Sequence, residues 1–179
     1  MNQEILLRLD RLTKKYREIL AVDDLTIEIY RGEIFGLLGP NGAGKTTTIN
    51  LIAGIIEPDS GQIFLEGENI QENKDLRREI GICPQFNIHW KKLTPREQLV
   101  FLGQMYDLAP TRINERSQIL IEALGLEEGA NRLAVKLSGG MQRRLNIALA
   151  LIHDTRILIL DEPEAGLDPQ SRIIVREYI

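Results

Sequence analysis

The stretch Gly39 to Thr47, which reads GPNGAGKTT, constrains this chain more than any other part of it. It matches the P-loop pattern G-x-x-x-x-G-K-[ST] at each fixed position. A P-loop needs a strand before it and a helix after it, and both patterns are present. Ile34 to Leu38 is a short apolar run typical of a buried strand, and apolar residues recur at helical spacing from Thr46 to Ile56. The sequence therefore predicts a phosphate-binding loop, with a glycine-rich turn that binds nothing as the alternative.

The residue types of this loop suit the phosphates of a nucleotide. Gly42 and Gly44 permit backbone angles and close approaches that a Cβ atom forbids, so N–H groups at a helix N-terminus can point at phosphate oxygens. Lys45 would reach the β- and γ-phosphates, and Thr46 would bind Mg²⁺. The predicted nucleotide-binding residues of the loop, of which Lys45 is also assigned a catalytic role, are Gly39, Pro40, Asn41, Gly42, Ala43, Gly44, Lys45, Thr46 and Thr47.

Composition limits the class of protein. The 179 residues are 43% hydrophobic and 27% charged, which is ordinary for a globular domain with a sizeable core. A net charge of −4 gives no support for non-specific nucleic-acid binding, so we expect no nucleic-acid partner. The sequence has neither an apolar stretch of about 20 residues nor a signal-peptide core, so we expect a cytosolic chain. Cys83 is the only cysteine, and we interpret it as a small core residue rather than a nucleophile.

Alternating and apolar patterns along the chain predict an α/β fold. Thr94 to Glu97 forms a capping box with proline at the first helical position. We predict a P-loop core with a mainly parallel sheet, an antiparallel β layer beside it and a helical insertion between strands. Strands are expected within 5–30, 61–67, 80–83 and 156–160. Three helices are expected: one that begins at 94, one that includes 113–124 and one that includes 141–152.

Two acids follow the apolar strand at 156–160. Asp161 and Glu162 come where a strand of an open α/β sheet ends, which is where ligands bind in such sheets. In a P-loop protein the first acid holds the Mg²⁺ shell, and the second can orient or deprotonate the attacking water. We therefore expect Asp161 to contact the metal and the nucleotide, and Glu162 to be catalytic. The alternative is a pair of solvated acids that begin a turn at Pro163.

The segment Leu137 to Gln142, which reads LSGGMQ, is a second predicted anion cradle. Ser138 can cap the helix that follows, while Gly139 and Gly140 leave backbone N–H groups open at the positive end of that helix. Alone, the pattern also fits a plain helix cap. Its position between the P-loop and the strand that Asp161 and Glu162 follow favours nucleotide binding by Ser138, Gly139 and Gly140.

With these motifs in this order, the chain resembles the ATP-binding cassette family, the nucleotide-binding subunits of ABC transporters. The resemblance covers essentially the whole sequence, and the signature segment LSGGMQRR, Leu137 to Arg144, is the motif that separates this family from other P-loop proteins. Met141, with the residues that follow it, resembles the branch serving exporters of drugs, polysaccharides and lipids. The resemblance implies an ABC-type domain over 1–179, with a RecA-like core at about 1–85 and 153–179 and a helical subdomain at about 86–152.

The resemblance implies roles for three further residues. Tyr16 matches the aromatic residue that stacks on adenine, with simple packing as the alternative. Gln85 resembles the glutamine of the Q-loop, which contacts Mg²⁺ or the attacking water and couples the site to the membrane partner. It is therefore assigned catalytic, nucleotide-binding and metal-binding roles. Asp168, in Gly166-Leu167-Asp168, resembles the D-loop aspartate that works across a dimer interface, and it can also cap the next helix.

The resemblance also implies partners and a location. A second ATP-binding subunit would form a head-to-tail dimer, in which the P-loop of one copy faces the signature segment of the other. ATP binding would close the dimer, and hydrolysis with Mg²⁺ would reopen it and drive a separate transmembrane permease subunit. The chain would then be attached peripherally to the cytoplasmic face of the membrane. The segment Phe86 to Leu93 would help to receive the permease or, as the alternative, pack the helical insertion onto the core.

One departure from the family pattern concerns histidine. The switch histidine of the family is expected beyond Asp168, but the two histidines of the chain are His89 and His153. Since the chain stops at Ile179, we expect it to be a truncated part of a longer subunit, which would account for the difference. Two alternative functions stay open: a soluble ABC-type ATPase acting on nucleic acid or ribosomes, and a hydrolysis-deficient ATP-binding module.

Overall fold

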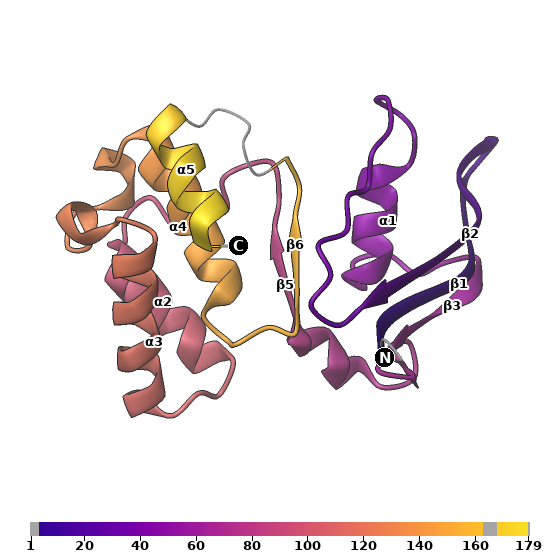
Figure 1. Ribbon diagram of the computed structural model, residues 1–179, viewed down its shortest axis with the longest axis horizontal. Coiled ribbons are helices and arrows are strands. Elements are labelled where there is room, and N and C mark those ends of the chain that lie inside the picture. Colours follow the sequence, from indigo (N-terminus) through magenta and orange to yellow (C-terminus); the bar gives the residue numbers. More distant parts are fainter. Residues whose placement is uncertain (1–3, 163–167, 179) are drawn as a thin grey trace. The chain divides into compact units, whose positions relative to one another are not determined.

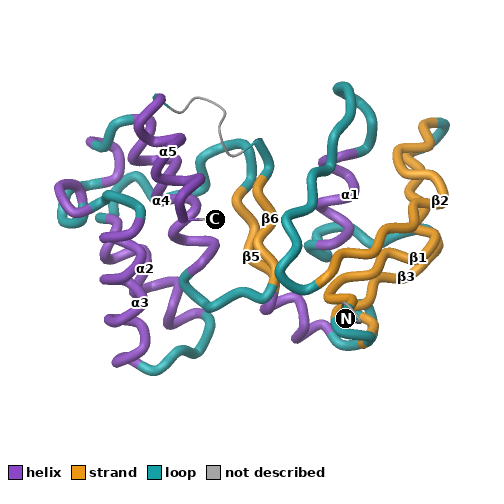
Figure 2. Tube along the Cα trace, in the orientation of Figure 1, coloured by secondary structure: helices purple, strands orange, loops and turns teal. Residues whose placement is uncertain are grey.

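The computed structural model divides the chain into two compact units, residues 1–77 and 78–179, and it describes residues 4–162 and 168–178 (Figure 1). The first unit holds an antiparallel sheet and one α-helix. The second holds a parallel pair of strands with its α-helices on one side of the pair (Figure 2). These layers agree with the predicted α/β class.

The first unit is built on a long β-hairpin, β1 (Ile5–Tyr16) and β2 (Ile19–Tyr30), which pair in antiparallel fashion. The other edge of β1 pairs with β3 (Ser60–Leu65), and β4 (Glu68–Asn69) completes the order β2-β1-β3-β4. Helix α1 (Lys45–Ile52) lies beside β2 and ends before Gly54, whose φ of +66° suits a helix terminus (Figure 1). The antiparallel layer expected from the sequence is therefore present.

The apolar run before the P-loop differs from the prediction. Residues 33–40 form no regular structure, and Ile34 and Leu38 are 83% and 92% exposed. An apolar run becomes a strand only where a neighbouring strand supplies backbone partners. Among the described residues, the sheet of the first unit does not pair with this run. The buried strand predicted at Ile34 to Leu38 is therefore wrong in this structure, whereas the loop and the helix follow in the predicted order.

In the second unit, the strands β5 (Ile80–Cys83) and β6 (Ile157–Leu160) pair in parallel and in register, so that Cys83 lies opposite Leu160. Both strands were predicted. The residues of β6 are half-buried rather than covered on both faces, because this sheet has two strands within the described residues. The register brings the segments that follow both strands to the same edge of the sheet.

The second unit has four α-helices within the described residues: α2 (Pro95–Met105), α3 (Pro110–Ala123), α4 (Gly139–Leu151) and α5 (Pro169–Tyr178). Short 3₁₀ turns lie at Glu127–Gly129 and Ala134–Lys136, and another, Lys74–Glu79, begins in the last residues of the first unit. The predicted capping box is confirmed, because the Thr94 hydroxyl accepts from Glu97 N while the Glu97 carboxylate accepts from Thr94 N. Helix α4 contacts β5, β6, α2, α3 and α5, so it is the centre of this unit (Figure 1). Among the described residues, no helix has the length and apolar character needed to cross a membrane.

Cys83 belongs to the core of the second unit. Its side chain is fully buried, and this burial raises the pKa of the thiol to about 11. A thiol with such a pKa is protonated at neutral pH and is a poor nucleophile. The prediction that Cys83 is a small core residue is confirmed.

Candidate functional site

The P-loop in the first unit is shaped by its lysine and its glycines. The Lys45 ammonium donates to the carbonyl oxygens of Gly39 at 2.7 Å and Pro40 at 2.9 Å, which closes the loop around the side chain. Gly42 and Gly44 have φ values of +86° and +81°, in the left-handed region that favours glycine. Gly44 is also the N-cap residue of α1, so the loop leads directly into the positive end of that helix.

Gly44 is required for a second reason. A Cβ atom at this position would lie 2.2 Å from the carbonyl oxygen of Ala21 in β2, a distance that no side chain tolerates. The P-loop pattern predicted a glycine here for the sake of a ligand. The structure shows that the packing of the loop on β2 demands it as well.

Tyr16 lies at the end of β1, beside the turn of the hairpin. Its side chain is 45% exposed, and the Lys14 ammonium lies 5.8 Å from the ring centroid. A ring buried in the core would have supported the packing alternative. The ring is exposed, and its stacking on adenine stays a prediction.

In the second unit, the ends of β5 and β6 bring Gln85 and Glu162 together. Each residue comes two positions after the paired residues Cys83 and Leu160, so the parallel register sets them side by side. The Gln85 amide donates to the Glu162 carboxylate at 2.7 Å. Asp161 lies one position earlier on its strand, and its N–H donates to the Cys83 carbonyl at 3.0 Å. The structure thus assembles the predicted glutamine and the predicted acid pair at one sheet edge.

Arg143 of α4 was missed by the sequence predictions. Its side chain donates to the carbonyl oxygens of Pro84, Gln85 (3.3 Å), Asp161 (2.7 Å) and Glu162 (3.0 Å), although the residue is only 4% exposed. The signal that could have found it is an arginine at helical spacing from Ile147 and Ala150, which are buried on the same side of α4. Arginine is almost never buried unless its donors are satisfied.

The signature segment begins α4 as predicted. The Ser138 hydroxyl accepts from Met141 N at 3.2 Å, which confirms the helix cap. Gly139 is exposed, and a Cβ atom there would meet nothing within 4 Å. Gly140 is buried, and a Cβ atom there would lie 2.4 Å from a carboxylate oxygen of Asp168. The first glycine therefore leaves space in front of the helix, and the second allows α4 to approach Asp168.

Asp168 caps helix α5, as the sequence suggested. Its carboxylate accepts from the N–H of Ser171 at 3.0 Å and from the hydroxyl of Ser171 at 2.7 Å. These hydrogen bonds hold the pKa of Asp168 below its usual value, so the group is ionised at neutral pH. Gly166 and Leu167, the other residues of the predicted D-loop, lie outside the described residues.

The segment after Gln85 is bonded to α4, while its apolar side chains are exposed. The Asn146 amide donates to the Asn87 side chain at 2.8 Å, and the N–H of Ile88 donates to the Asn146 oxygen at 3.3 Å. Phe86, Ile88 and Trp90 are all exposed. Docking of the permease and packing of the insertion onto the core both stay predictions for this segment.

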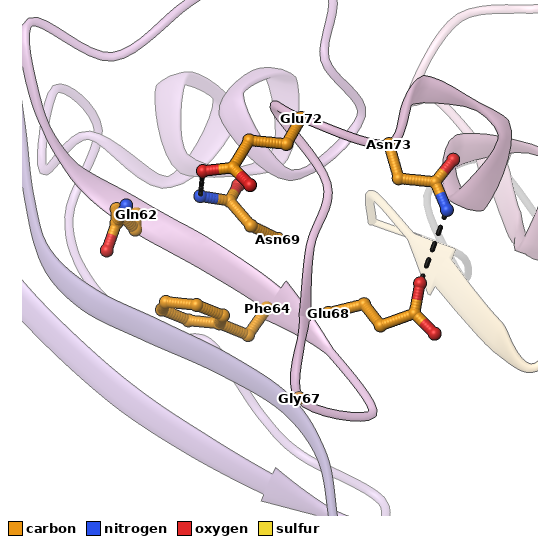
Figure 3. A pocket seen from close by; sticks show the side chains of 7 residues that line it. All are labelled: Gln62, Phe64, Gly67, Glu68, Asn69, Glu72 and Asn73. Carbon is orange, nitrogen blue, oxygen red and sulfur yellow. Dashed lines mark hydrogen bonds between the residues drawn. The ribbon is translucent and has the colours of Figure 1, made fainter.

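A hollow of about 390 Å³ lies on the β3–β4 hairpin of the first unit, beside Phe64 (Figure 3). Its polar side chains bond to one another. Asn69 donates to Glu72 at 3.3 Å, and Asn73 donates to Glu68 at 3.2 Å. None of the predicted nucleotide-binding residues lines this hollow, so we do not assign the nucleotide to it.

A profile of the family described as ABC transporter matches residues 22–165. The chain belongs to the ABC transporter family. The resemblance inferred from the P-loop, the signature segment and the acid pair is therefore confirmed. The predicted fold class is also confirmed, because the solved structures that the chain resembles include one described as the ATP binding subunit of an ABC transporter. That structure is 31% identical in sequence and has a TM-score of 0.87. The match covers 96% of this chain and 72% of the chain in that structure.

Relatives within the ABC transporter family have names that concern export and resistance. The chain is 43% identical over 175 residues to the Nod factor export ATP-binding protein I of Cupriavidus pinatubonensis, covering 97% of this chain and 54% of that protein. It is 41% identical to the linearmycin resistance ATP-binding protein LnrL of Bacillus subtilis, covering 97% of this chain and 56% of that protein. The chain thus spans about half the length of these relatives.

Proposed function

We propose that this chain is the ATP-binding and ATP-hydrolysing part of an ABC exporter. The observation that carries the proposal is the pairing of Gln85 with Glu162 at 2.7 Å, beside Asp161, at the end of the parallel strands. A glutamine and two acids at this edge of an α/β sheet suit a metal-dependent attack by water. The relatives named for Nod factor export and for linearmycin resistance support the exporter branch.

Each group has a role in this proposal. Lys45 neutralises charge on the β- and γ-phosphates, and the glycines of the P-loop present N–H groups to them. Tyr16 stacks on the adenine ring. Thr46, Asp161 and Gln85 offer the hydroxyl, carboxylate and amide oxygens that Mg²⁺ prefers, and Mg²⁺ when bound neutralises phosphate charge. Glu162 accepts a proton from the water that attacks the γ-phosphate, while Gln85 orients that water.

The first residues of the signature segment, Ser138, Gly139 and Gly140, are proposed to serve a second copy of the subunit. The Ser138 hydroxyl uses an oxygen lone pair in the helix cap, so its proton stays available for a phosphate oxygen. Gly139 opens space before the positive end of α4. These features support a head-to-tail dimer in which Ser138, Gly139 and Gly140 of one copy contact the ATP of the other, with Asp168 close to the seam.

The membrane partner is proposed to dock at the segment after Gln85. Phe86, Ile88 and Trp90 are exposed there, and the ring of Trp90 packs edge-on against Phe101 of α2 with centroids 5.4 Å apart. Exposed apolar side chains grouped in this way suit a protein interface. A permease that binds here would hold the chain at the cytoplasmic face of the membrane and take up the motion that dimer closure produces.

The proposal is tested by Lys45→Ala. Loss of the ammonium should raise the dissociation constant for ATP by about 10- to 100-fold, since a charge-assisted hydrogen bond contributes about 1.5–3 kcal/mol. Isothermal titration calorimetry with MgATP measures the change. Lys74→Ala, at an exposed position of the same unit, is the matched control and should bind as the parent does. An unchanged dissociation constant in Lys45→Ala would remove the nucleotide assignment.

A further inference from the structure

The ends of β5 and β6 leave carbonyl groups that the two-stranded ladder does not pair. Pro84 and Gln85 follow β5, and Asp161 and Glu162 follow β6, so these oxygens lie beyond the last paired residues. A backbone carbonyl without a protein donor lacks the hydrogen bond that would fix its segment. Whatever supplies those donors therefore also decides how well Gln85 and Glu162 are positioned.

A single side chain supplies them. The guanidinium of Arg143 reaches all four carbonyl oxygens, with one terminal nitrogen facing the segment after β5 and the other facing the segment after β6. Guanidinium has five N–H donors in a rigid planar fork, which a lysine ammonium cannot reproduce. The fork thus ties the two segments to each other and to α4.

The backbone conformation of Glu162 also needs support from its neighbours. Its φ is +49°, a left-handed value that costs a non-glycine residue about 1–2 kcal/mol. Such a conformation persists only where the surroundings hold it. The bond from Arg143 to the Glu162 carbonyl, together with the bond from Gln85 to its carboxylate, holds both ends of this residue.

We propose that Arg143 is a positioning residue, which fixes Gln85 and Glu162 in the geometry that hydrolysis needs. This inference rests on the proposed function, because it concerns the same acid and glutamine. Arg143 acts through four backbone carbonyls and takes no part in the proton transfer itself.

The neighbouring Arg144 is a matched control. It is also buried on α4, and its guanidinium also donates to two carbonyl oxygens, those of Leu124 at 2.6 Å and Gly125 at 2.7 Å. These carbonyls belong to the end of α3. Replacing either arginine by lysine therefore removes a similar buried fork, but only Arg143→Lys releases the segments that hold Gln85 and Glu162.

The test compares Arg143→Lys with Arg144→Lys in steady-state ATP hydrolysis by the purified protein. Arg143→Lys should lower kcat by about tenfold or more while KM for ATP changes by less than about threefold, since misplacement affects the chemical step more than binding. Arg144→Lys should keep kcat within about twofold even where urea unfolding shows a comparable loss of stability. In a Glu162→Gln background, Arg143→Lys should have no further effect on the residual rate.

Hydrogen exchange gives a readout that does not depend on turnover. Arg143→Lys should speed exchange at the amides of 85–89 and 161–162, and Arg144→Lys should leave these amides as they are in the parent protein. Equal kcat and equal exchange in the two variants would overturn the proposal for Arg143 and leave the proposed function in place. A parent protein that fails to bind MgATP would instead overturn the proposed function and this inference with it.

Discussion

Two glycines of the P-loop share a backbone conformation but differ in their surroundings. Gly42 and Gly44 have φ values of +86° and +81°. A Cβ atom on Gly42 would meet nothing within 4 Å, whereas one on Gly44 would lie 2.2 Å from the Ala21 carbonyl oxygen. The cost of a methyl group should therefore be conformational at the first position, and both conformational and steric at the second.

We predict that Gly44→Ala lowers the free energy of unfolding by about 3 kcal/mol or more, and Gly42→Ala by about 1–2 kcal/mol. The first value includes displacement of the loop from β2, and the second is the cost of the left-handed conformation alone. Urea unfolding of both variants measures the difference. Equal losses of stability would show that contact with Ala21 does not matter.

The functional residues differ in whether a sequence motif can identify them. The roles proposed for Lys45 and Glu162 could be read from motifs, because the motif itself names the residue type and its neighbours. Arg143 could not be found in that way, because its partners are carbonyl oxygens of residues 84, 85, 161 and 162, about 20 and 60 positions away in the sequence. Any residue type provides a carbonyl, so such contacts leave no pattern.

The end of α4 packs on the end of α2. The ring of His153, just after α4, stacks on the ring of Tyr106, the residue that caps α2, with centroids 3.8 Å apart and planes at 1°. Burial lowers the pKa of His153 from 6.5 to about 4. The folded chain therefore holds this imidazole neutral at a pH where the unfolded chain would protonate it.

The lowered pKa of His153 makes the folded chain less stable at acidic pH. Because the folded pKa lies below the unfolded one, the unfolded chain binds more protons between the two values, and stability falls as the pH drops from about 6.5 towards about 4. We predict that His153 accounts for about 2–3 kcal/mol of this loss. His153→Phe retains a ring against Tyr106 and should remove that part of the decline. Urea unfolding from pH 7 to pH 4 gives the two profiles, and parallel profiles would contradict the prediction.

Elements with local signals were predicted best. The capping box at Thr94 and the strand Ile80–Cys83 have signals within a few residues, and both are present in the structure. The run Ile34 to Leu38 has the same apolar signal, but a strand also needs a partner, which a sequence pattern does not record. The division into a core and a helical subdomain stays a prediction.

The proposed function requires a second copy of the chain. Its signature segment has open space at Gly139, and Asp168 is ionised and close to Gly140. If hydrolysis normally reopens the dimer, removing the general base should leave the closed state populated.

We therefore predict that Glu162→Gln forms a stable dimer in saturating ATP and Mg²⁺, because the amide cannot accept the proton of the attacking water. Multi-angle light scattering should give twice the mass of the monomer for this variant. Glu128→Gln removes the same charge from an exposed position and should behave as the parent does. A Glu162→Gln protein that stays monomeric under these conditions would count against the dimer.

The carbonyl contacts of Arg143 have a consequence for evolution. Because the guanidinium binds backbone oxygens, a substitution of the side chain at Gln85 or Glu162 leaves its contacts to the backbone intact. A gene copy that lost the proposed general base would keep the contacts from Arg143 to the ends of both strands. Selection can therefore change the side chains at this sheet edge while the backbone contacts of Arg143 are retained. A descendant that no longer hydrolyses ATP could still serve as a structural subunit.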